Sequence, residues 1–240
     1  MPLRVLLSCL IVLFFGACAP LVEPRASPAV EVGPDVLSAR SVALVADRLD
    51  TGFYSSYCSG VWLSYRAIVT AGHCMHEGEI GDPYGYVVKG DVFPDGGAEA
   101  AELKGARLAR LALLDEDHDL AILVATNPPP HDSAKLGDAY QGQPVQTIGH
   151  PAGLWFSYSS GVVAAVRKEA IGLDIVWVQS TAQISPGNSG GGLFDLEGNL
   201  LGVCSRGYTG RAQGLNFWVH SHYVSDAIAK LGLVGKDGGA

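Results

Sequence analysis

The feature that most constrains this chain is a series of short apolar segments separated by turn residues. The segments are rich in β-branched and aromatic side chains, which is typical of β-strands. Glycine is frequent between them, with 31 glycines in 240 residues, and it is the residue that tight turns accept most easily. The pattern therefore predicts an all-β chain of two antiparallel barrels. The expected strands cover residues 41–46, 58–63, 67–70, 84–89, 107–114, 120–125, 145–148, 161–167, 175–179, 200–205 and 215–219.

A proline-rich stretch divides this series in two. Asn127–Pro128–Pro129–Pro130–His131–Asp132 cannot lie inside a sheet or a helix, because proline fixes φ and has no N–H. We expect a linker at residues 127–134 between an N-terminal barrel, residues 38–126, and a C-terminal barrel, residues 135–220.

Only the end of the chain has a helical pattern. Ser221 is expected to cap a helix over residues 221–232, in which Val224, Ile228 and Leu231 share one face. Residues 38–232 are then a single domain of two barrels and one helix.

The N-terminus has the pattern of an export signal. Positive charge in residues 1–4 precedes an apolar run over residues 5–15, which is too short to cross a bilayer as a helix, and Gly16 and Ala17 follow. We interpret residues 1–17 as a signal peptide. Residues 18–37 contain several prolines and no apolar periodicity, which predicts an extended tether.

Two cleavage sites compete at the end of this signal. Phe15–Gly16–Ala17–Cys18 resembles a bacterial lipobox, in which Cys18 is lipidated and anchors the protein at the cell envelope. The alternative, cleavage by ordinary signal peptidase after Ala17–Cys18–Ala19, gives a soluble periplasmic or secreted protein. Because the second cut is followed by an unfavourable Pro20, the lipid anchor is the preferred interpretation.

Charge and cysteine usage exclude several classes of protein. The net charge is −8 and no basic run occurs, which argues against a nucleic-acid partner. Cys58 and Cys74 bracket a hairpin pattern and are predicted to form a disulfide, whereas Cys204 lies in an apolar run and is expected to be a buried, inert thiol. No paired cysteine or histidine spacing suggests a metal, and no cofactor is expected.

Three motifs at strand ends carry chemistry. The first, Thr70–Ala71–Gly72–His73–Cys74, directly follows an apolar strand, and the second places Asp119 at the start of the apolar run 120–123. The third is Gly187–Asn188–Ser189–Gly190–Gly191–Gly192. Each motif alone is a weak signal, but their order His, Asp, Ser is specific.

With these motifs, residues 38–232 resemble a trypsin-like (chymotrypsin-fold) serine endopeptidase, closest to bacterial peptidases of the HtrA and glutamyl endopeptidase kind. The resemblance implies two six-stranded antiparallel barrels and cleavage of peptide or protein substrates through an acyl-enzyme intermediate. Only about 20 residues follow Val219, so the PDZ domain of HtrA-type proteins is not expected. The sequence carries no prediction of oligomeric state.

The resemblance also assigns roles. His73 is the general base, Asp119 orients its imidazole, and Ser189 is the nucleophile. The backbone N–H groups of Gly187 and Ser189 form the oxyanion hole. Ser205 is expected to donate a hydrogen bond to Asp119.

The resemblance implies that specificity depends on three further residues and on Ser205–Arg206–Gly207, the segment that pairs with substrate backbone. Gln183 takes the pocket-floor position beside Ile184, and Asn216 takes a wall position. A pocket without a carboxylate suits small or medium uncharged side chains and not Lys or Arg. Arg206 stands where an aromatic residue is common in the family, and its charge favours acidic substrates.

Asn188 stands where secreted digestive relatives have Asp. The ion pair between that Asp and a freshly cut N-terminus cannot form, which predicts activity without propeptide cleavage.

Two alternatives stay open: a catalytically silent protease-fold module that binds a partner, and an esterase with the same triad. The remaining histidines are expected to be surface, loop or packing residues; they are His76, His118, His131, His150, His220 and His222.

Overall fold

Antiparallel pairing of neighbouring segments organises this chain. The structure is a computed structural model, and it describes residues 42–48, 54–64, 66–75, 78–88, 106–128, 132–168, 175–208 and 214–232. These residues belong to one compact unit, residues 35–240. The predicted signal peptide, the lipidation site Cys18 and the tether lie outside the described residues.

The first barrel is closed in the order β1-β2-β3-β6-β5-β4. Every neighbouring pair in it is antiparallel, and the mostly apolar, buried strands β3 and β6 pair over five residues. Its strands are β1 (Val42–Arg48), β2 (Tyr54–Trp62), β3 (Ala67–Ala71), β4 (Pro83–Val88), β5 (Arg107–Asp115) and β6 (Leu120–Ala125).

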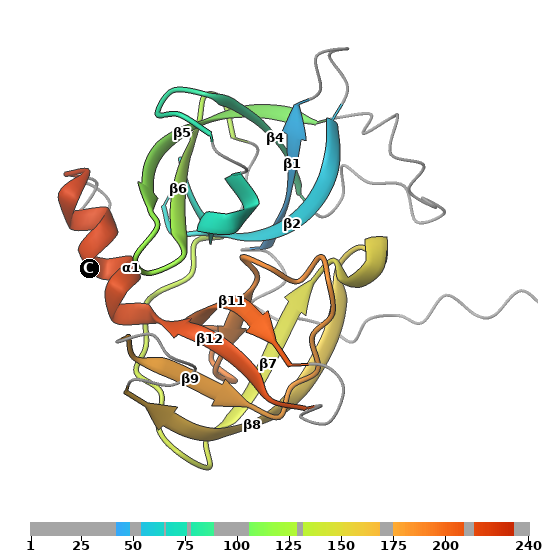
Figure 1. The fold of residues 1–240 in the computed structure, drawn as a ribbon, viewed down its shortest axis with the longest axis vertical. Helices are drawn as coiled ribbons and strands as arrows, with labels where there is room; N and C mark the ends of the chain where they lie inside the picture. Colours follow the sequence, from blue (N-terminus) through green and yellow to red (C-terminus); the bar gives the residue numbers. More distant parts are fainter. Residues whose placement is uncertain are drawn as a thin grey trace, which may run out of the picture. The chain divides into compact units, whose positions relative to one another are not determined.

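The second barrel is closed in the order β10-β11-β12-β9-β8-β7 and lies below the first in the view of Figure 1. The expected fold class, two six-stranded antiparallel barrels, is therefore confirmed for the described part of the chain. The strands of the second barrel are β7 (Pro144–Gly149), β8 (Ser157–Arg167), β9 (Trp177–Ser180), β10 (Gly192–Phe194), β11 (Leu200–Gly207) and β12 (Asn216–His220).

A helix, α1 (Ser221–Lys230), follows β12 directly and runs beside both barrels in Figure 1. Its cap differs from the expectation. His220 is the N-cap residue and accepts a hydrogen bond from the N–H of His222 at 3.2 Å, while Ser221 is the first helical residue and donates to the carbonyl of Gly137 instead. The imidazole of His220 reaches back over the helix start, so the cap moves one residue earlier.

The apolar core has three parts. One cluster fills the first barrel around Trp62 and Ile68, and another fills the second around Leu193 and Trp218. The third joins residues of both barrels with α1 and includes Ile122. Because this shared cluster buries apolar surface of both barrels together, it fixes one barrel against the other.

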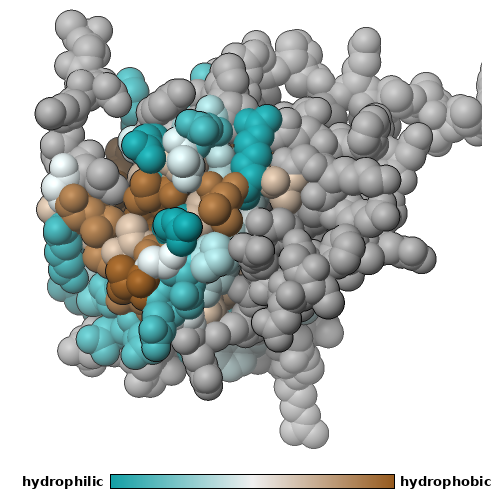
Figure 2. Space-filling view, turned by 90° about the horizontal axis from the view of Figure 1, so that it is seen from above, coloured by the Kyte–Doolittle hydropathy of each residue, from teal (hydrophilic) through white to brown (hydrophobic). Residues whose placement is uncertain are grey.

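On the face seen in Figure 2, apolar residues of the described part of the chain lie together with polar residues around them. In the described residues, no helix has both the length and the apolar character that a membrane-crossing helix needs.

Candidate active site

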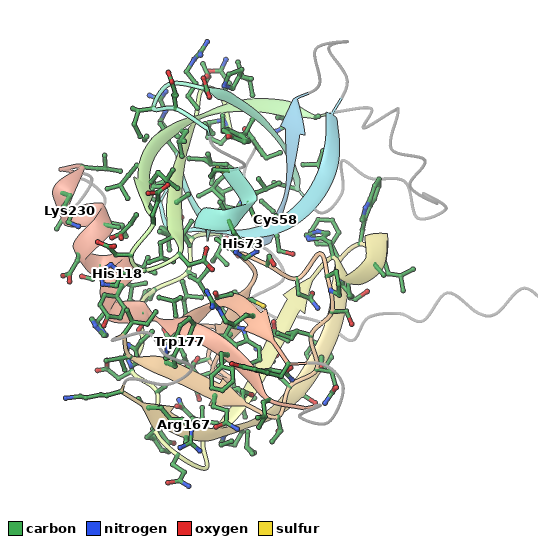
Figure 3. The ribbon with its side chains drawn as sticks, viewed as in Figure 1. Cys58, His73, His118, Arg167, Trp177 and Lys230 are labelled. Atoms are coloured by element: carbon green, nitrogen blue, oxygen red, sulfur yellow. A yellow bond between two sulfur atoms is a disulfide. The ribbon has the colours of Figure 1, made fainter. Side chains whose placement is uncertain are left out.

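His73 lies on a short helical turn at the end of β3. This turn, η2 (Gly72–Met75), starts at a glycine whose missing side chain lets the backbone of Asp119 approach: a Cβ on Gly72 would lie 3.1 Å from the Asp119 carbonyl carbon. A disulfide joins Cys74 to Cys58 and so holds the turn to β2. The His73 side chain is 47% exposed and faces the second barrel (Figure 3).

Asp119 lies between a tight turn and β6, with φ at +53°, a backbone conformation that side-chain-bearing residues seldom adopt. Its Oδ1 accepts hydrogen bonds from the backbone N–H of His73 at 2.8 Å and is 3.0 Å from Nδ1, and its Oδ2 is 2.9 Å from the same Nδ1. Ser205 donates its hydroxyl to Oδ2. The carboxylate is therefore held from two elements at once.

These contacts explain the charge of Asp119. Burial alone would raise its pKa, but the hydrogen bonds and charge of His73, together with the hydroxyl of Ser205, outweigh burial and lower the pKa of Asp119. The carboxylate thus stays ionised near neutral pH. Since an ionised carboxylate can only accept, the proton between the two groups lies on Nδ1 of His73.

Ser189 completes the chain of contacts. Its Oγ lies 2.8 Å from Nε2 of His73, across 116 residues of sequence. With Nδ1 protonated, Nε2 is the acceptor and Ser189 donates its hydroxyl proton to it. The three predicted catalytic side chains are thus brought together by β3, β6 and the loop before β10.

The loop that carries Ser189 has a constrained backbone. Gly187 has φ of +101° and Gly190 of +81°. A Cβ on Gly187 would come within 2.2 Å of the His150 carbonyl oxygen, and one on Gly190 would come as close to the carbonyl oxygen of Ser59. Only glycine fits either position.

Hydrogen bonds orient the two predicted oxyanion N–H groups. The carbonyl of Pro186 accepts from the N–H of Ala152 at 2.7 Å, and the carbonyl of Asn188 accepts from the N–H of Gly191 at 2.8 Å. In a trans peptide the following N–H points the opposite way. The N–H groups of Gly187 and Ser189 accordingly point away from these partners, and within the described part of the chain they donate to no other group.

Three of the predicted specificity residues lie together. A Cβ on Gly207 would meet Asn216 Oδ1 at 3.0 Å and Ile184 Cδ1 at 3.3 Å. Asn216 is buried, and its amide donates to the carbonyl of Ala182 at 2.8 Å. Gln183 is exposed, and its side-chain amide donates to the carbonyl of Thr181 at 3.2 Å.

Arg206 lies at the end of β11, next to Ser205. Its guanidinium carbon is 5.4 Å from the centre of the buried Trp177 ring, a cation–π arrangement, and its Nε is 3.4 Å from Ser205 Oγ. Arg206 is exposed and forms no ion pair with any described residue. Its aromatic partner Trp177 is labelled in Figure 3, below His73.

Sequence reasoning missed two residues that touch the Ser189 loop, Ser59 and His150. Both are fully buried, and their side chains meet at 2.9 Å between Ser59 Oγ and His150 Nδ1. Ser59 follows Cys58 within β2 and His150 directly follows β7, so no periodicity distinguishes either residue from ordinary core. Their partner is a loop almost 130 residues from Ser59, which no local pattern reveals.

Cys204 is buried, and burial, with the charge of Asp119 second, raises the pKa of its thiol. Among the residues whose placement is described, no group of three or more His, Cys, Asp or Glu side chains is arranged to hold a metal ion.

Two closed six-stranded barrels with a histidine on one and a serine loop on the other define a chymotrypsin-like fold. The family comparison agrees: the model of the trypsin-like peptidase domain matches residues 58–203, more than half of the chain. The chain belongs to this family.

Curated relatives are of the HtrA type. The chain is 34% identical over 137 residues to a probable periplasmic serine endoprotease DegP-like of Hahella chejuensis, which is 55% of this chain and 28% of that protein. It is 35% identical over 109 residues to the serine endoprotease DegS of Haemophilus influenzae, 42% of this chain and 32% of that protein. The chain thus matches about a third of the length of these relatives.

Solved structures show the same fold. The HtrA-type protease AlgW, as an S227A variant with a tripeptide, has a TM-score of 0.65 at 23% identity, covering 80% of this chain and 60% of that one. A serine endoprotease from Yersinia pestis has a TM-score of 0.62 at 22% identity, covering 84% and 68%.

Proposed function

We propose that this protein is a serine endopeptidase that cleaves peptide bonds through Ser189, His73 and Asp119. The observation that carries the proposal is the unbroken hydrogen-bond chain from Asp119 through both nitrogens of His73 to Ser189 Oγ, with contacts of 2.8–3.0 Å. The names of two relatives agree with this proposal, since the DegP-like and DegS proteins are both called serine endoproteases.

The geometry supports a two-step mechanism. Ser189 Oγ attacks the scissile carbonyl carbon while His73 Nε2 takes its proton, and His73 then gives that proton to the leaving amine. The resulting acyl-enzyme is hydrolysed by water activated by the same imidazole. Asp119 stabilises the imidazolium that forms in each step, because its carboxylate is ionised and fixed by Ser205.

The negative oxygen that develops during each attack is stabilised by the N–H groups of Gly187 and Ser189. Removing one such donor costs about 2.7 to 4 kcal/mol of transition-state stabilisation. Because both N–H groups are already turned away from the rest of their loop, no energy is needed to orient them during the reaction.

The substrate binds as an added strand along Ser205–Gly207. β12 pairs with this segment on one side, whereas on the other side β10 and the preceding Gly190 and Gly191 bond β11 only as far as Cys204. The free backbone groups beyond that point suit an extended peptide. AlgW has been solved with a tripeptide and with a decapeptide, which is consistent with this mode.

The side chain before the scissile bond enters the space beside Gly207, Ile184 and Asn216. Ile184 gives this space an apolar wall, Gln183 leaves it without a carboxylate, and the close packing on Gly207 limits its size. We therefore expect cleavage after small or medium uncharged residues rather than after Lys or Arg.

A fluorophosphonate probe tests the proposal directly, because it labels only an activated serine. Wild-type protein should be labelled, and Ser189→Ala and His73→Ala should not. Ser185→Ala is the matched control, since Ser185 is an exposed serine of the same loop, and its labelling should equal wild type. Folded wild-type protein that resists labelling would instead favour a silent module, and labelled protein that cleaves esters but no peptides would favour an esterase.

We further propose that the protein is exported and held at the bacterial cell envelope through Cys18. The sequence pattern of residues 1–18 and the periplasmic relatives support this location. Cells expressing the full chain should incorporate labelled palmitate into the protein, and Cys18→Ala should abolish the incorporation. A wild-type protein without label would favour the soluble periplasmic or secreted form, and label that persists in Cys18→Ala would show that Cys18 is not the acylated residue.

A further inference from the structure

Ser59 and His150 form a buried pair on the inner side of the nucleophile loop. Ser59 belongs to β2 of the first barrel, and His150 directly follows β7 of the second. Both are 0% exposed. The hydroxyl of Ser59 lies 2.9 Å from Nδ1 of His150 and also accepts the backbone N–H of His150 at 3.1 Å.

The same serine binds two carbonyls of the nucleophile loop. Its Oγ donates to the Gly187 carbonyl at 2.8 Å, and its backbone N–H donates to the Ser189 carbonyl at 2.7 Å. Ser59 thus contacts the loop on both sides of Asn188, next to each residue whose N–H is assigned to the oxyanion hole.

Counting protons fixes the state of His150. A carbonyl oxygen can only accept, so the single hydroxyl proton of Ser59 goes to Gly187. Nδ1 of His150 must then carry the proton that it shares with Ser59 Oγ, and Nε2 is an unprotonated nitrogen. Nε2 is buried, has no hydrogen-bond partner within the described residues, and the ring edge packs on Phe156 at 4.7 Å between centres.

The loop needs an external contact at this point. Gly187 has φ of +101°, and because glycine permits other backbone angles as well, contacts from outside the loop must select the observed one. The Gly187 carbonyl is held by Ser59, and the opposed N–H of Asn188 donates to Ser185 at 3.0 Å. Turning this peptide over would break both bonds and would move the neighbouring N–H of Gly187.

We propose that Ser59 and His150 are positioning residues that hold the Gly187–Asn188 peptide so that the oxyanion N–H groups stay aimed at the substrate. This inference rests on the proposed peptidase function. His150 orients the hydroxyl of Ser59 by donating to it, and Ser59 in turn fixes the loop. Since the two residues come from different barrels, the orientation of the loop depends on the barrels being docked.

Three variants test the pair through kinetics. His150→Leu removes the donor, Ser59→Ala removes the hydroxyl, and His150→Asn restores an N–H at about the position of Nδ1. The first two should lower kcat by about 10- to 100-fold with KM within about 3-fold, because they disturb but do not delete an oxyanion donor, whose removal costs roughly 100- to 1,000-fold. His150→Asn should recover most of the wild-type kcat.

Thr147→Val is the matched control. Thr147 is 3% exposed and donates its hydroxyl to the carbonyl of Gly192 at 2.8 Å, so its loss also removes a buried hydroxyl from the second barrel. It should keep the wild-type kcat at a similar loss of stability. Wild-type kcat in folded Ser59→Ala and His150→Leu, or an equal loss in Thr147→Val, would overturn the proposal.

Hydrogen–deuterium exchange provides a readout that does not depend on activity. Residues 181–191 should exchange faster in Ser59→Ala and His150→Leu than in wild type, and no faster in Thr147→Val or His150→Asn. Unchanged exchange in the first two variants would reject the positioning role even if the wild-type protein proved inactive. Inactivity of the wild type alone would reject the peptidase function.

Discussion

The burial of His150 makes the stability of the folded protein depend on pH. Burial lowers its pKa from 6.5 to about 3, so the folded protein leaves the imidazole neutral in a range where the unfolded chain protonates it. The unfolded state then binds more protons between pH 6.5 and about pH 3, and stability must rise with pH over that window. A histidine buried without a partner for its positive charge lowers the stability of the folded protein in this way as the pH falls.

The prediction compares wild type with His150→Asn, which does not titrate. The free energy of unfolding of wild type should fall more steeply as pH decreases from 6.5, by about 1.4 kcal/mol per pH unit for one proton. Urea unfolding at a series of pH values measures both slopes. Asp119 acts separately, since its lowered pKa places its loss of stabilisation below pH 3.8. Parallel curves for the two proteins above pH 4 would show that His150 is not the group responsible.

Arg206 gives the proposed substrate-binding edge of β11 a positive charge. Its guanidinium is held over Trp177 and meets no acidic partner in the described residues, so it is available to a substrate carboxylate. Because the arginine is exposed, the gain is limited to that of an exposed ion pair, about 0.2 to 1 kcal/mol.

Paired peptides that differ only in Asp versus Asn, or Glu versus Gln, on the amino-terminal side of the cut measure this effect. Wild type should prefer the acidic peptide by about 2- to 5-fold in kcat/KM at low salt, and Arg206→Glu should reverse the preference. Arg167→Gln is the control, since Arg167 is an exposed arginine on β8 that binds Gln179 instead. A preference unchanged by Arg206→Glu would rule out this subsite.

At the scale of elements, the short turn η2 depends on its covalent link to β2. The Cys58–Cys74 disulfide closes a loop with a sequence separation of 16 and ties the turn that carries His73 to the strand that carries Ser59. Replacing both cysteines with serine should lower the free energy of unfolding by about 3 kcal/mol. Activity should fall as well, because His73 loses a fixed position.

Denaturant unfolding and kcat/KM of the double variant test this dependence. Cys204→Ala is the control, because the thiol of Cys204 is free and buried and its raised pKa keeps it protonated. Equal stability of the double variant and wild type under oxidising conditions would contradict the prediction.

Elements with strong local patterns were predictable from sequence, and those set by long-range contact were not. β6 occupies residues 120–125 as expected, because an uninterrupted apolar run bounded by turns defines it. β10 was missed, since Gly192–Phe194 is short and forms a strand only by pairing with β7 and β11. For the same reason β8 begins at Ser157 rather than at 161, where its polar residues pair with β7.

The candidate site likewise has residues that the sequence predicted and residues that it did not. Family resemblance located His73, Asp119, Ser189 and Ser205, and the structure brings these four together. The Ser59–His150 pair and the helix contact of the Asp119 turn had no local signature. In the latter, His118 stacks on Tyr223 of α1 at 4.1 Å and Asp115 lies 3.7 Å from Lys230 (Figure 3).

At the scale of the whole molecule, each barrel supplies an incomplete set of groups. His73, Asp119 and Ser59 come from the first barrel, and Ser189 and His150 come from the second. Neither barrel alone holds the proposed base, the proposed nucleophile and the loop of the proposed oxyanion hole. The shared core around Ile122 therefore stabilises the site as well as the fold.

The hydrogen bonds around Asn188 bear on whether the protein needs cleavage at its N-terminus to become active. Asn188 is 5% exposed and uncharged, its N–H donates to Ser185, and its Oδ1 lies against Gly149. A buried amide needs no counter-ion, whereas a buried carboxylate would need one. The nucleophile loop is held by hydrogen bonds to Ser59, Ala152 and Gly191, all in the described part of the chain, and we therefore expect that no new N-terminal amine is required to order it.

Two versions of the chain test this expectation, one beginning at residue 38 and one carrying several additional residues before it. Both should have the same kcat/KM on a peptide substrate, because the amine plays no part in holding the loop. Asn188→Asp provides the contrast: it buries a carboxylate without a partner, which should lower activity in both versions alike. A gain of orders of magnitude on exposing one particular N-terminus would show that the loop is ordered by cleavage and that its hydrogen bonds within the barrels are not sufficient.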